Sequence, residues 1–406
     1  NNKNSFIQDF LLISKIKQKI KNYQYLREIL SELPNESIIV GGFIRDIILE
    51  RLSPYPDIDI VIPNNSQEIG KNIAVKFSGR FLILDKDRNI VRIVFKDFII
   101  DIANQTHELL YEDLKSRDFT INSIGFSFAN GKLIDPSNGI YDLKNSLLRS
   151  HNNANLLYDP LRILRYFRFF SELNFQIEPH IIEFIKLNKF QLKAVSVERI
   201  QYELKKIVQG KEALKTVEFL NEIKIFDWIQ SYESNYSNGL LFESFDNFSQ
   251  DEIDKFFPIA YLKELLKETV IKKFKFSKSD TLSINSLRKW SEKLKQKSIL
   301  NFTEIERFDL HQELEMNLPA FIIYLPKKFH KEWLKRWRNK KDKLFHPRNY
   351  INGKQLKNII GIEDGPLLGD LLKYLSREFA YERLRNFDEA IYKAKEWFQQ
   401  NAPKCD

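Results

Sequence analysis

The chain of 406 residues is long enough for two or three domains, and its 43% hydrophobic and 29% charged residues are typical of a globular protein. Its 64 basic residues against 55 acidic ones give a net charge of +9, which favours a polyanionic partner such as nucleic acid or a nucleotide. A single cysteine, Cys405, excludes a disulfide scaffold and a cysteine-ligated zinc site, and no uncharged run is long enough for a signal peptide or a membrane span. We therefore expect a cytoplasmic protein with no membrane partner.

The first part of the chain is predicted to mix strands with helices. We expect residues 1–35 to form an N-terminal helical extension. Within residues 36–150, short β-branched or aromatic runs bounded by Gly, Pro, Asp or Asn predict strands. These runs are residues 37–40, 58–62, 80–84, 90–95 and 98–103.

The rest of the chain is predicted to be helical. From about Leu156 the apolar residues recur three or four positions apart, as in Leu161, Leu164, Phe167 and Phe170. Residues 231–249 are rich in Ser, Asn and Tyr around a turn dipeptide, which predicts a loop or a boundary between helical blocks. The expected fold class is therefore α+β, a mixed-sheet domain followed by helices.

The first candidate site is a glycine turn between an apolar run and a helical pattern. Gly41 and Gly42 follow Val40, and Arg45 and Asp46 lie in the first turn of the predicted helix. Paired glycines let backbone N–H groups approach a phosphate, and an arginine can add a charge-assisted contact. The alternative is an ordinary tight turn in which Arg45 pairs with Asp46.

Three carboxylates interrupt or begin neighbouring apolar strands. Asp57 and Asp59 alternate with Ile58, so both point to one face, and Asp101 interrupts the apolar run 98–103. Like charges placed this close favour a cation between them, and hard oxygen ligands suit Mg²⁺. The three could hold two Mg²⁺ ions for in-line phosphoryl transfer. The alternative for Asp57 and Asp59 is a pair of solvated aspartates at a strand end.

Two polar clusters further along could bind a nucleotide. Arg117 could hold a triphosphate, and Asp118 and Asn122 could hydrogen-bond ribose hydroxyls; the alternative is a capped turn with surface ion pairs. Asp159 and Pro160 are typical of a helix start. The helix that they begin carries arginines every three residues along one side, facing either a triphosphate or only solvent: Arg162, Arg165 and Arg168.

Taken in chain order, these motifs resemble those of the bacterial-type (class II) tRNA nucleotidyltransferase and poly(A) polymerase family. The matching motifs are Gly41-Gly42-x-x-Arg45-Asp46, Asp57-x-Asp59, Arg117-Asp118-Phe119-Thr120-x-Asn122, Asp135-Pro136 with Asp142-Leu143, and Asp159-Pro160-Leu161-Arg162-x-x-Arg165. The match covers roughly residues 37–210 and includes Glu198-Arg199 and Glu203, which are similar to the family's neck motif.

The resemblance implies a nucleotidyltransferase head of the polymerase-beta-like fold over residues 36–150. It implies a helical neck over residues 151–212 that binds the nucleotide base and RNA, and a helical, tRNA-binding body and tail over residues 213–406. The implied reaction is addition of nucleotides to the tRNA 3′ end without a nucleic-acid template, by two-metal transfer.

By position, the resemblance implies that Asp57 and Asp59 bind Mg²⁺, and the strand pattern itself adds Asp101 as the third catalytic carboxylate. It places Asp118 near the ribose of the incoming nucleotide, and Asp159 and Arg162 at the family's base-reading pair. The remaining nucleotide-binding positions that it implies are Gly42, Arg45, Arg117, Arg165 and Arg168. The glycine turn and the polar cluster themselves add Gly41 and Asn122 to the candidate nucleotide-binding residues.

Two departures from the family pattern bear on which nucleotides are added. Tyr158 stands where the family usually has Glu, immediately before the base-reading Asp159. Only residues 102–116 separate Asp101 from Arg117, whereas full CCA-adding members carry a longer flexible loop there. The short loop resembles the CC-adding branch, which uses CTP and needs a separate A-adding enzyme. No His-Asp dipeptide of an attached phosphohydrolase domain is present.

A basic cluster near residue 335 is predicted to contact tRNA phosphates. Between residues 327 and 343, nine basic side chains face two acidic ones. The residues most favoured for RNA contact are Lys327, Lys328, Lys331, Lys335, Arg336 and Arg338. Phe329, Trp333 and Trp337 share one helical stripe, for which core packing is favoured over base stacking.

Three alternatives to CC addition stay open. The first two, within the enzyme class, are a full CCA-adding enzyme that also uses ATP and a poly(A) polymerase. The third, of another class, is a catalytically inert RNA-binding module that kept the fold. The clustered carboxylates argue against the inert module, because an inert pocket gains nothing from unpaired charges.

Overall fold

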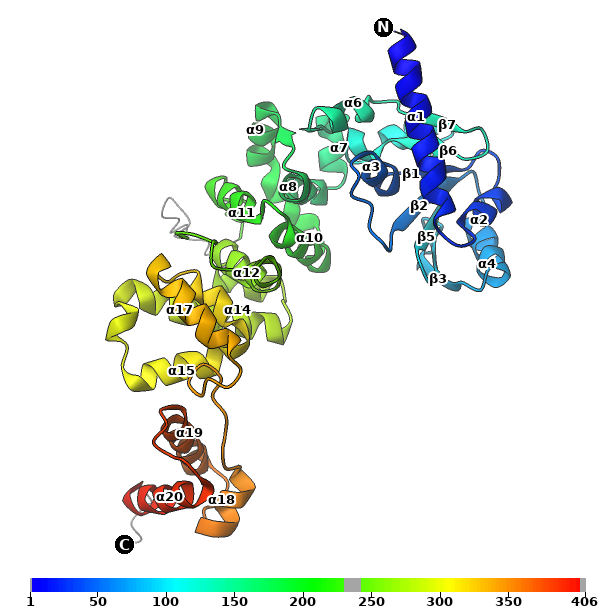
Figure 1. Ribbon diagram of the computed structural model, residues 1–406. Coiled ribbons are helices and arrows are strands. Elements are labelled where there is room, and N and C mark those ends of the chain that lie inside the picture. Colours follow the sequence, from blue (N-terminus) through cyan, green and yellow to red (C-terminus); the bar gives the residue numbers. More distant parts are fainter. Residues whose placement is uncertain (1, 230–241, 402–406) are drawn as a thin grey trace. The chain divides into compact units, whose positions relative to one another are not determined.

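The computed structural model describes residues 2–229 and 242–401 (Figure 1). Cys405 and residues 231–241 of the predicted loop lie outside the described residues. The chain divides into two compact units, and the division falls within helix α10 (Val197–Gln209). The first unit comprises Asn1–Glu203 and Gly210–Glu212, and the second comprises Leu204–Gln209 and the chain from Ala213 on. Within the described ranges, no helix is long and apolar enough to cross a membrane.

A seven-stranded mixed sheet forms the centre of the first unit. Its strand order is β3-β4-β5-β2-β1-β6-β7, in which β2 and β5 run parallel and every other neighbouring pair runs antiparallel. The strands are β1 (Ile38–Val40), β2 (Asp57–Ile62), β3 (Arg80–Asp85), β4 (Ile90–Val94), β5 (Ile99–Asn104), β6 (Gly125–Ser127) and β7 (Lys132–Ile134). The mixed sheet followed by helices confirms the predicted α+β fold class.

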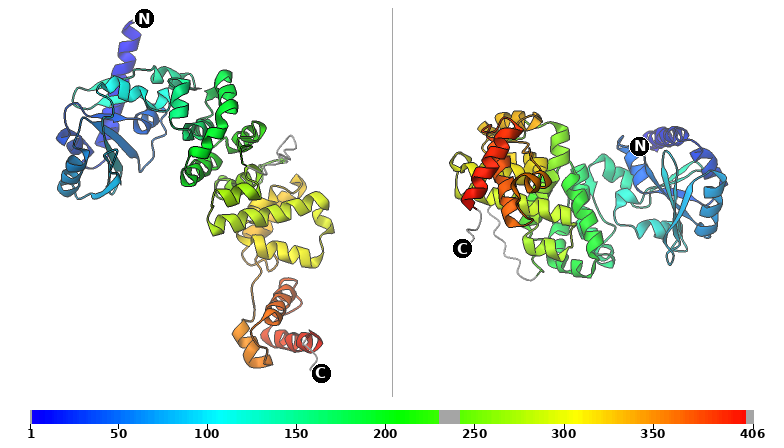
Figure 2. Two further views of the ribbon diagram at one scale, coloured as in Figure 1. Left: turned by 180° about the vertical axis from the view of Figure 1, so that it is seen from behind. Right: turned by 90° about the horizontal axis from the view of Figure 1, so that it is seen from below.

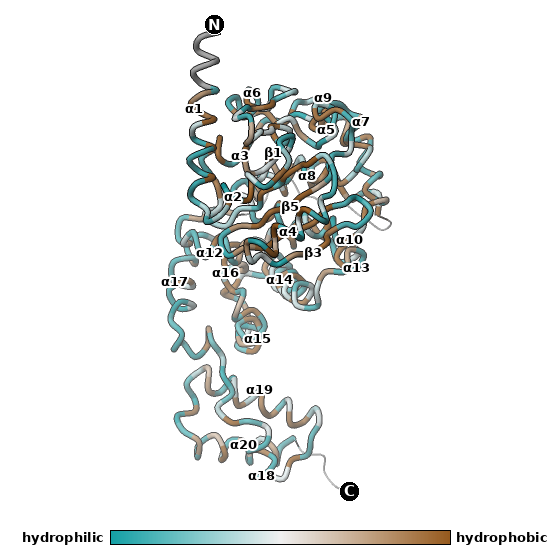
Figure 3. Tube along the Cα trace, turned by 90° about the vertical axis from the view of Figure 1, so that its right-hand side faces the viewer, coloured by the Kyte–Doolittle hydropathy of each residue, from teal (hydrophilic) through white to brown (hydrophobic). Residues whose placement is uncertain are grey.

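Hydrophobic runs place the central strands in the core. Ile58, Ile60, Ile100 and Ile102 are all 1% exposed or less, and they alternate with the aspartates of β2 and β5. Figure 3 shows hydrophobic segments along the strands, in contrast to the largely hydrophilic helix α17 (Lys327–Arg338). The alternation therefore leaves the carboxylates on the opposite face of the same two strands.

Helices cover the sheet of the first unit (Figure 2). The first turn after β1 leads into α3 (Gly42–Ile48), which contacts β1 and β2, and α4 (Ser66–Lys76) contacts β3, β4 and β5. The remaining helices of the head are α1 (Asn2–Lys21), α2 (Leu26–Glu32), α5 (Leu110–Lys115), a 3-10 helix at Thr120–Asn122, and α6 (Gly139–Lys144). The first two lie within residues 1–35, and α1 contacts α3 and β7.

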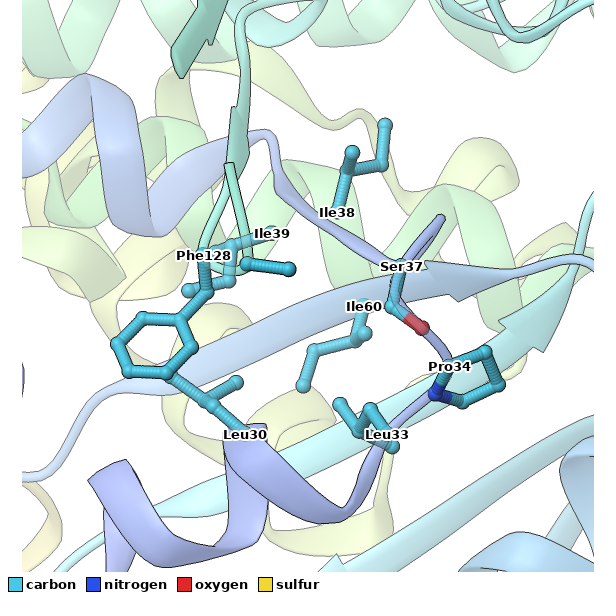
Figure 4. A pocket seen from close by; sticks show the side chains of 9 residues that line it. Leu30, Leu33, Pro34, Ser37, Ile38, Ile39, Ile60 and Phe128 are labelled. Atoms are coloured by element: carbon cyan, nitrogen blue, oxygen red, sulfur yellow. The ribbon is translucent and has the colours of Figure 1, made fainter. Parts of the chain in front are cut away.

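A small apolar cavity lies between α2 and the sheet (Figure 4). Leu30 and Leu33 line it on the helix side, and Ile39, Ile60 and Phe128 line it on the other. Its volume is only about 10 Å³, which leaves room for no more than one water. It is a packing gap of the core and not a ligand site.

Helices of the neck complete the first unit. They are α7 (Asn153–Tyr158), α8 (Leu161–Leu173), α9 (Pro179–Asn188), a 3-10 helix at Lys189–Ala194, and α10 as far as Glu203. Two short strands, β8 (Leu147–Leu148) and β9 (Gln176–Ile177), pair in parallel beside them. The neck is thus helical apart from β9. This strand has two residues and is too short to be recognised from the sequence.

The second unit is helical throughout its described residues. Its helices are α11 (Ala213–Glu222), α12 (Gln250–Leu265), α13 (Glu268–Lys273), α14 (Lys278–Gln296), α15 (Glu304–Leu314), α16 (Leu318–Ile322), α17, α18 (Gly353–Ile360), α19 (Pro366–Ala380) and α20 (Phe387–Asn401). Two single-turn 3-10 helices precede α15 and α16. Helices α18, α19 and α20 share a core of their own, built around Leu356, Leu371 and Leu375.

Candidate active site

The glycine turn and the aspartates of β2 meet at one edge of the sheet. Val40, the last residue of β1, pairs with Asp59 of β2, and Asp59 pairs with Asp101 of β5. Gly41 follows with a φ of +75°, a region that favours glycine. A Cβ atom at Gly41 would lie 3.5 Å from Asp59 Oδ2 and 3.7 Å from Arg117 Nη1. The turn, the carboxylate and the arginine therefore border one site.

Burial sets the electrostatics of Asp59. Withdrawal from water raises the pKa of its carboxyl group; Arg117 opposes this effect, and the negative charges of Asp101 and Asp57 add to it. Arg117 has a buried Nε that lacks a hydrogen-bond partner. The site therefore holds clustered negative charge beside Arg117, a cation whose Nε has no hydrogen-bond partner.

Asp101, expected to be the third metal-binding carboxylate, is paired with an arginine. Arg92, which pairs with it across β4 and β5, donates from Nε and Nη2 to its two oxygens, both at 2.8 Å. No group of three His, Cys, Asp or Glu in the described ranges is arranged to hold a metal ion. Arg92 was missed in the sequence, although a charge in the middle of the apolar run 90–94 was a usable signal.

The remaining donor set still fits Mg²⁺. Asp57 and Asp59 supply hard carboxylate oxygens on one strand face, and no described residue forms an ion pair or a hydrogen bond with the Asp57 side chain. Mg²⁺ usually binds one or two carboxylates and completes its octahedron with waters and substrate phosphates. Two carboxylates, with waters and substrate phosphates as the remaining ligands, therefore satisfy this requirement.

Arg45 is internally paired, as the alternative to phosphate binding predicted, but it is not on the surface. It is 7% exposed, donates from Nε to Asp46 at 2.9 Å, and donates from Nη1 to Asn122 Oδ1 at 2.7 Å. Asn122 in turn donates to Asp118 Oδ1 at 3.1 Å. Arg45 therefore holds the 3-10 helix at Thr120–Asn122 against α3.

Asp118 is saturated with hydrogen bonds. Its Oδ1 accepts from the N–H of Phe119 at 2.8 Å and from Asn122, and its Oδ2 accepts from Arg165 Nε at 2.7 Å. Burial acts against ionisation, but Arg165 and these donors hold the pKa of Asp118 below its usual range. A direct ribose contact requires that one of these bonds be exchanged.

The arginines of α8 are not a solvated helix face. Arg162 donates to the carbonyls of Asn155 and Ser116, both at 3.0 Å. Arg165 and Arg168 both approach the buried Glu203, at 3.7 and 3.5 Å. All three are partly buried, so the solvated alternative is wrong.

The two residues expected to read the base are not hydrogen-bonded to each other. Asp159 Oδ2 pairs instead with Arg199 Nη2 of α10 at 2.6 Å, and its Oδ1 accepts from the N–H of Leu161 at 3.3 Å. Tyr158, beside it, is 86% exposed. Arg199 lies in the neck motif of the sequence, but its pairing with Asp159, forty positions earlier, could not be read from spacing.

The other motif residues are structural. Asp135 accepts from the N–H groups of Gly139 and Ile140, at 2.7 and 2.9 Å, and so caps α6. The fully buried Asp142 accepts from Thr120 Oγ1 at 2.5 Å and pairs with Arg149. These contacts hold α6 against the segment that carries Asp118 and Asn122.

A neutral histidine braces the same segment. His151 lies between Ser123 Oγ, 2.7 Å from Nε2, and Ser137 Oγ, 2.9 Å from Nδ1, and burial lowers its pKa to about 4. Its ordinary pKa is about 6.5, so between these values the unfolded chain binds more protons, and acidification destabilises the fold. We expect His151→Gln to flatten the fall in melting temperature between these pH values, whereas His107→Asn, at an exposed position, leaves it unchanged. An unaltered profile in His151→Gln would contradict this role.

The predicted basic cluster divides into paired and unpaired residues. Lys327, Arg336 and Arg338 form ion pairs with Asp246, Asp342 and Glu252 at 2.6 to 2.8 Å. Lys328, Lys331 and Lys335 are exposed on α17 and form no ion pair with a described residue. Trp333 and Trp337, at 4% and 8% exposed, are confirmed as core residues.

Known proteins match the chain over almost its whole length. The family model of the poly(A) polymerase head domain matches residues 37–111 and 103–149, that of the RNA- and SrmB-binding site of polymerase A matches residues 174–232, and that of tRNA nucleotidyltransferase domain 2 matches residues 252–394. A CC-adding tRNA nucleotidyltransferase of Synechocystis is 30% identical over 397 residues, which cover 90% of this chain and 95% of that protein. The chain belongs to the bacterial-type tRNA nucleotidyltransferase family.

As a member of this tRNA nucleotidyltransferase family, the protein is a nucleotidyltransferase. A CCA-adding enzyme of Streptococcus uberis is 27% identical over 379 residues, covering 86% of this chain and 90% of the relative. The CCA-adding enzyme of Thermotoga maritima, solved with tRNA, has the same fold, with a TM-score of 0.66 and 22% identity over 95% of this chain and 98% of that one. Because CC-adding and CCA-adding relatives both match, membership of the tRNA nucleotidyltransferase family leaves the number of added nucleotides open.

Proposed function

We propose that this nucleotidyltransferase adds two cytidines to the 3′ end of tRNA from CTP and then stops. The observation that carries the proposal is the connection between β5 and α5, residues 105–109, which is short and tied down. Thr106 donates from its N–H and its hydroxyl to Asp113 at 2.8 and 2.6 Å, and the Gln105 side chain donates to the carbonyls of His107 and Glu108. A connection of five residues is too short to rearrange the pocket to accept ATP after CTP, and these bonds also hold it in place.

In the proposed reaction the terminal tRNA hydroxyl attacks the α-phosphorus of CTP, the bond to the β-phosphate oxygen breaks, and pyrophosphate leaves. Asp57 and Asp59 would hold Mg²⁺, which supplies Lewis-acid stabilisation of the phosphates. Arg117 lies beside Asp59 and offers its guanidinium to the triphosphate. The backbone turn at Gly41 leaves the space in which the phosphates can approach both.

Base selection is assigned to Asp159 and Arg162. A carboxylate accepts a hydrogen bond from the amino group of cytosine and repels the carbonyl that uracil carries at that position. Arg162 uses two of its five N–H donors on Asn155 and Ser116, so its others can reach a ring acceptor. The ion pair with Arg199 orients Asp159, in place of the acidic neighbour that Tyr158 replaces.

The tRNA backbone is the proposed partner of the unpaired lysines of α17. Lys328, Lys331 and Lys335 are spaced by three and four positions and so share one helix face. Each lysine that neutralises a phosphate releases counterions, which makes binding weaken steeply with salt.

The proposal is tested by resolving reaction products at single-nucleotide length. Purified protein with Mg²⁺ and tRNA lacking its 3′ CCA receives CTP alone, ATP alone, or both. We expect two added cytidines with CTP and the same two with both nucleotides, while ATP alone adds nothing. A separate A-adding enzyme should then complete the end.

A matched variant sharpens this test. Thr106→Val with Asp113→Ala removes the bonds between these two residues without changing the length of the loop. The product should stay at two cytidines, because the loop is too short to reach the pocket even when it is free. A third residue, adenosine, in the wild-type product would contradict CC addition and make the protein a complete CCA-adding enzyme.

A further inference from the structure

Ion pairs between α3, α8, α10 and the Asp118 segment close into a ring within the first unit. Asp46 pairs with Arg45 (2.9 Å) and Arg51 (3.1 Å), Arg51 with Glu172 (3.4 Å), Glu172 with Arg168 (2.8 Å) and Arg168 with Glu203 (3.5 Å). Glu203 pairs with Arg165 (3.7 Å), and Arg165 pairs with Asp118 (2.6 Å). Asn122 closes the ring through two hydrogen bonds: it donates to Asp118 (3.1 Å) and accepts from Arg45 (2.7 Å). Positive and negative groups alternate around the ring, so its charges balance.

The side chain of Phe169 lies among three guanidinium groups of this ring. The Cζ atoms of Arg45, Arg165 and Arg168 lie 5.1, 5.7 and 5.3 Å from the centroid of its phenyl group. Phe169 is 2% exposed, and Phe119 meets it edge-on at 5.3 Å. Within about 6 Å, the quadrupole of an aromatic ring attracts a cation, and a buried phenyl group excludes the water that would screen the ion pairs.

Phe169 contacts arginines of two helices, α8 and α3. Arg165 and Phe169 are four residues apart on α8 and therefore share a helix face, whereas Arg45 comes from α3 of the head. Each of these guanidinium groups also pairs with a carboxylate of the ion-pair ring, so the same groups make the contacts with Phe169 and the ion pairs. Phe169 thus sets the direction in which Arg165 donates to Asp118.

Asp118 connects the ring to the active site. It is the immediate neighbour of Arg117, whose Nη1 borders Gly41 and whose charge acts on Asp59. Movement of Asp118 would therefore displace the guanidinium that is offered to the triphosphate.

We propose that Phe169 is a positioning residue for nucleotide binding, which acts by holding Arg45, Arg165 and Arg168 so that Asp118 and Arg117 keep their places. This inference rests on the proposed use of CTP at this site. Phe169 itself does not touch the nucleotide. Its effect is on the affinity for the triphosphate and not on the contact with tRNA.

The test compares Phe169→Leu with Phe126→Leu, a change of the same size in β6. Phe126 is also fully buried, and no arginine of the described chain lies over its ring. We expect Phe169→Leu to raise the KM for CTP and the dissociation constant for CTP at least fivefold, with kcat and the KM for tRNA within twofold of wild type. Phe126→Leu should lose a similar amount of thermal stability without the change in CTP affinity.

Two further variants separate positioning from mere packing. Phe169→Met fills the apolar volume without an aromatic ring and should reproduce the loss of CTP affinity even if Phe169→Leu fails to fold. Phe169→Tyr keeps the aromatic ring and should retain most of the wild-type CTP affinity. Unchanged CTP affinity in both Phe169→Leu and Phe169→Met would overturn the inference. Wild-type protein that binds CTP but transfers nothing to tRNA would overturn the proposed function instead, and the binding comparison would still decide the role of Phe169.

Discussion

Replacing Asp57 by alanine is expected to reduce nucleotide transfer by about a thousandfold or more, because it removes one of two carboxylates that can hold Mg²⁺ against the phosphates. The side chain is exposed at the first position of β2 and forms no ion pair with a described residue, so the fold should be retained. The measurement is CMP incorporation into tRNA over a Mg²⁺ titration, with tRNA affinity determined on the same preparations.

Asp87→Ala is the matched control for this variant. Asp87 is an exposed aspartate in the turn between β3 and β4 and forms no ion pair in the described chain, so its removal should leave transfer unchanged. Retention of more than a tenth of the wild-type rate by Asp57→Ala would remove the metal-binding role from this residue. Loss of tRNA binding along with activity would point to misfolding, which the melting curve of the same sample reveals.

The sequence was most informative where a local period decides the structure. Alternation around Asp57 and Asp59 placed both on one face of a strand, and the short β-branched runs located β1 to β5 within one or two residues. β6 and β7 were not predicted, because three-residue strands are too short to show alternation. The strand pairing that brings Asp101 beside Asp59 is a long-range property of the sheet.

The sequence could not show which groups the charged side chains bond to. Arg45 could equally contact a phosphate or pair with Asp46, and only the fold brings Asn122, 77 positions later, to its other nitrogen. Arg165 likewise meets Asp118 across 47 positions. The family motifs identified the residues that gather at the site, whereas the division between residues free to bind a nucleotide and residues that hold others in place required the structure.

Asp118→Ala is expected to destabilise the first unit by about 3 kcal/mol, because it leaves the buried side of Arg165 without its carboxylate. The N–H of Phe119 and the amide of Asn122 lose their acceptor in the same step. Urea unfolding, followed by a probe in the first unit, measures this effect separately from the helical second unit.

The pH dependence of stability distinguishes this account from a simple loss of packing. The pKa of Asp118 lies below its usual value near 4, so its stabilisation is present above that value and is lost as the pH falls through the lower folded pKa. Asp118→Asn keeps the shape but removes the titration, and its stability should therefore fall less than that of wild type on acidification. Equal acid sensitivity of the two proteins would show that Asp118 is not the ionised centre of this network. If Asp118→Ala also left the unfolding midpoint unchanged, Arg165 would have to find its counter-charge in Glu203, whose nearest oxygen now lies 3.7 Å away.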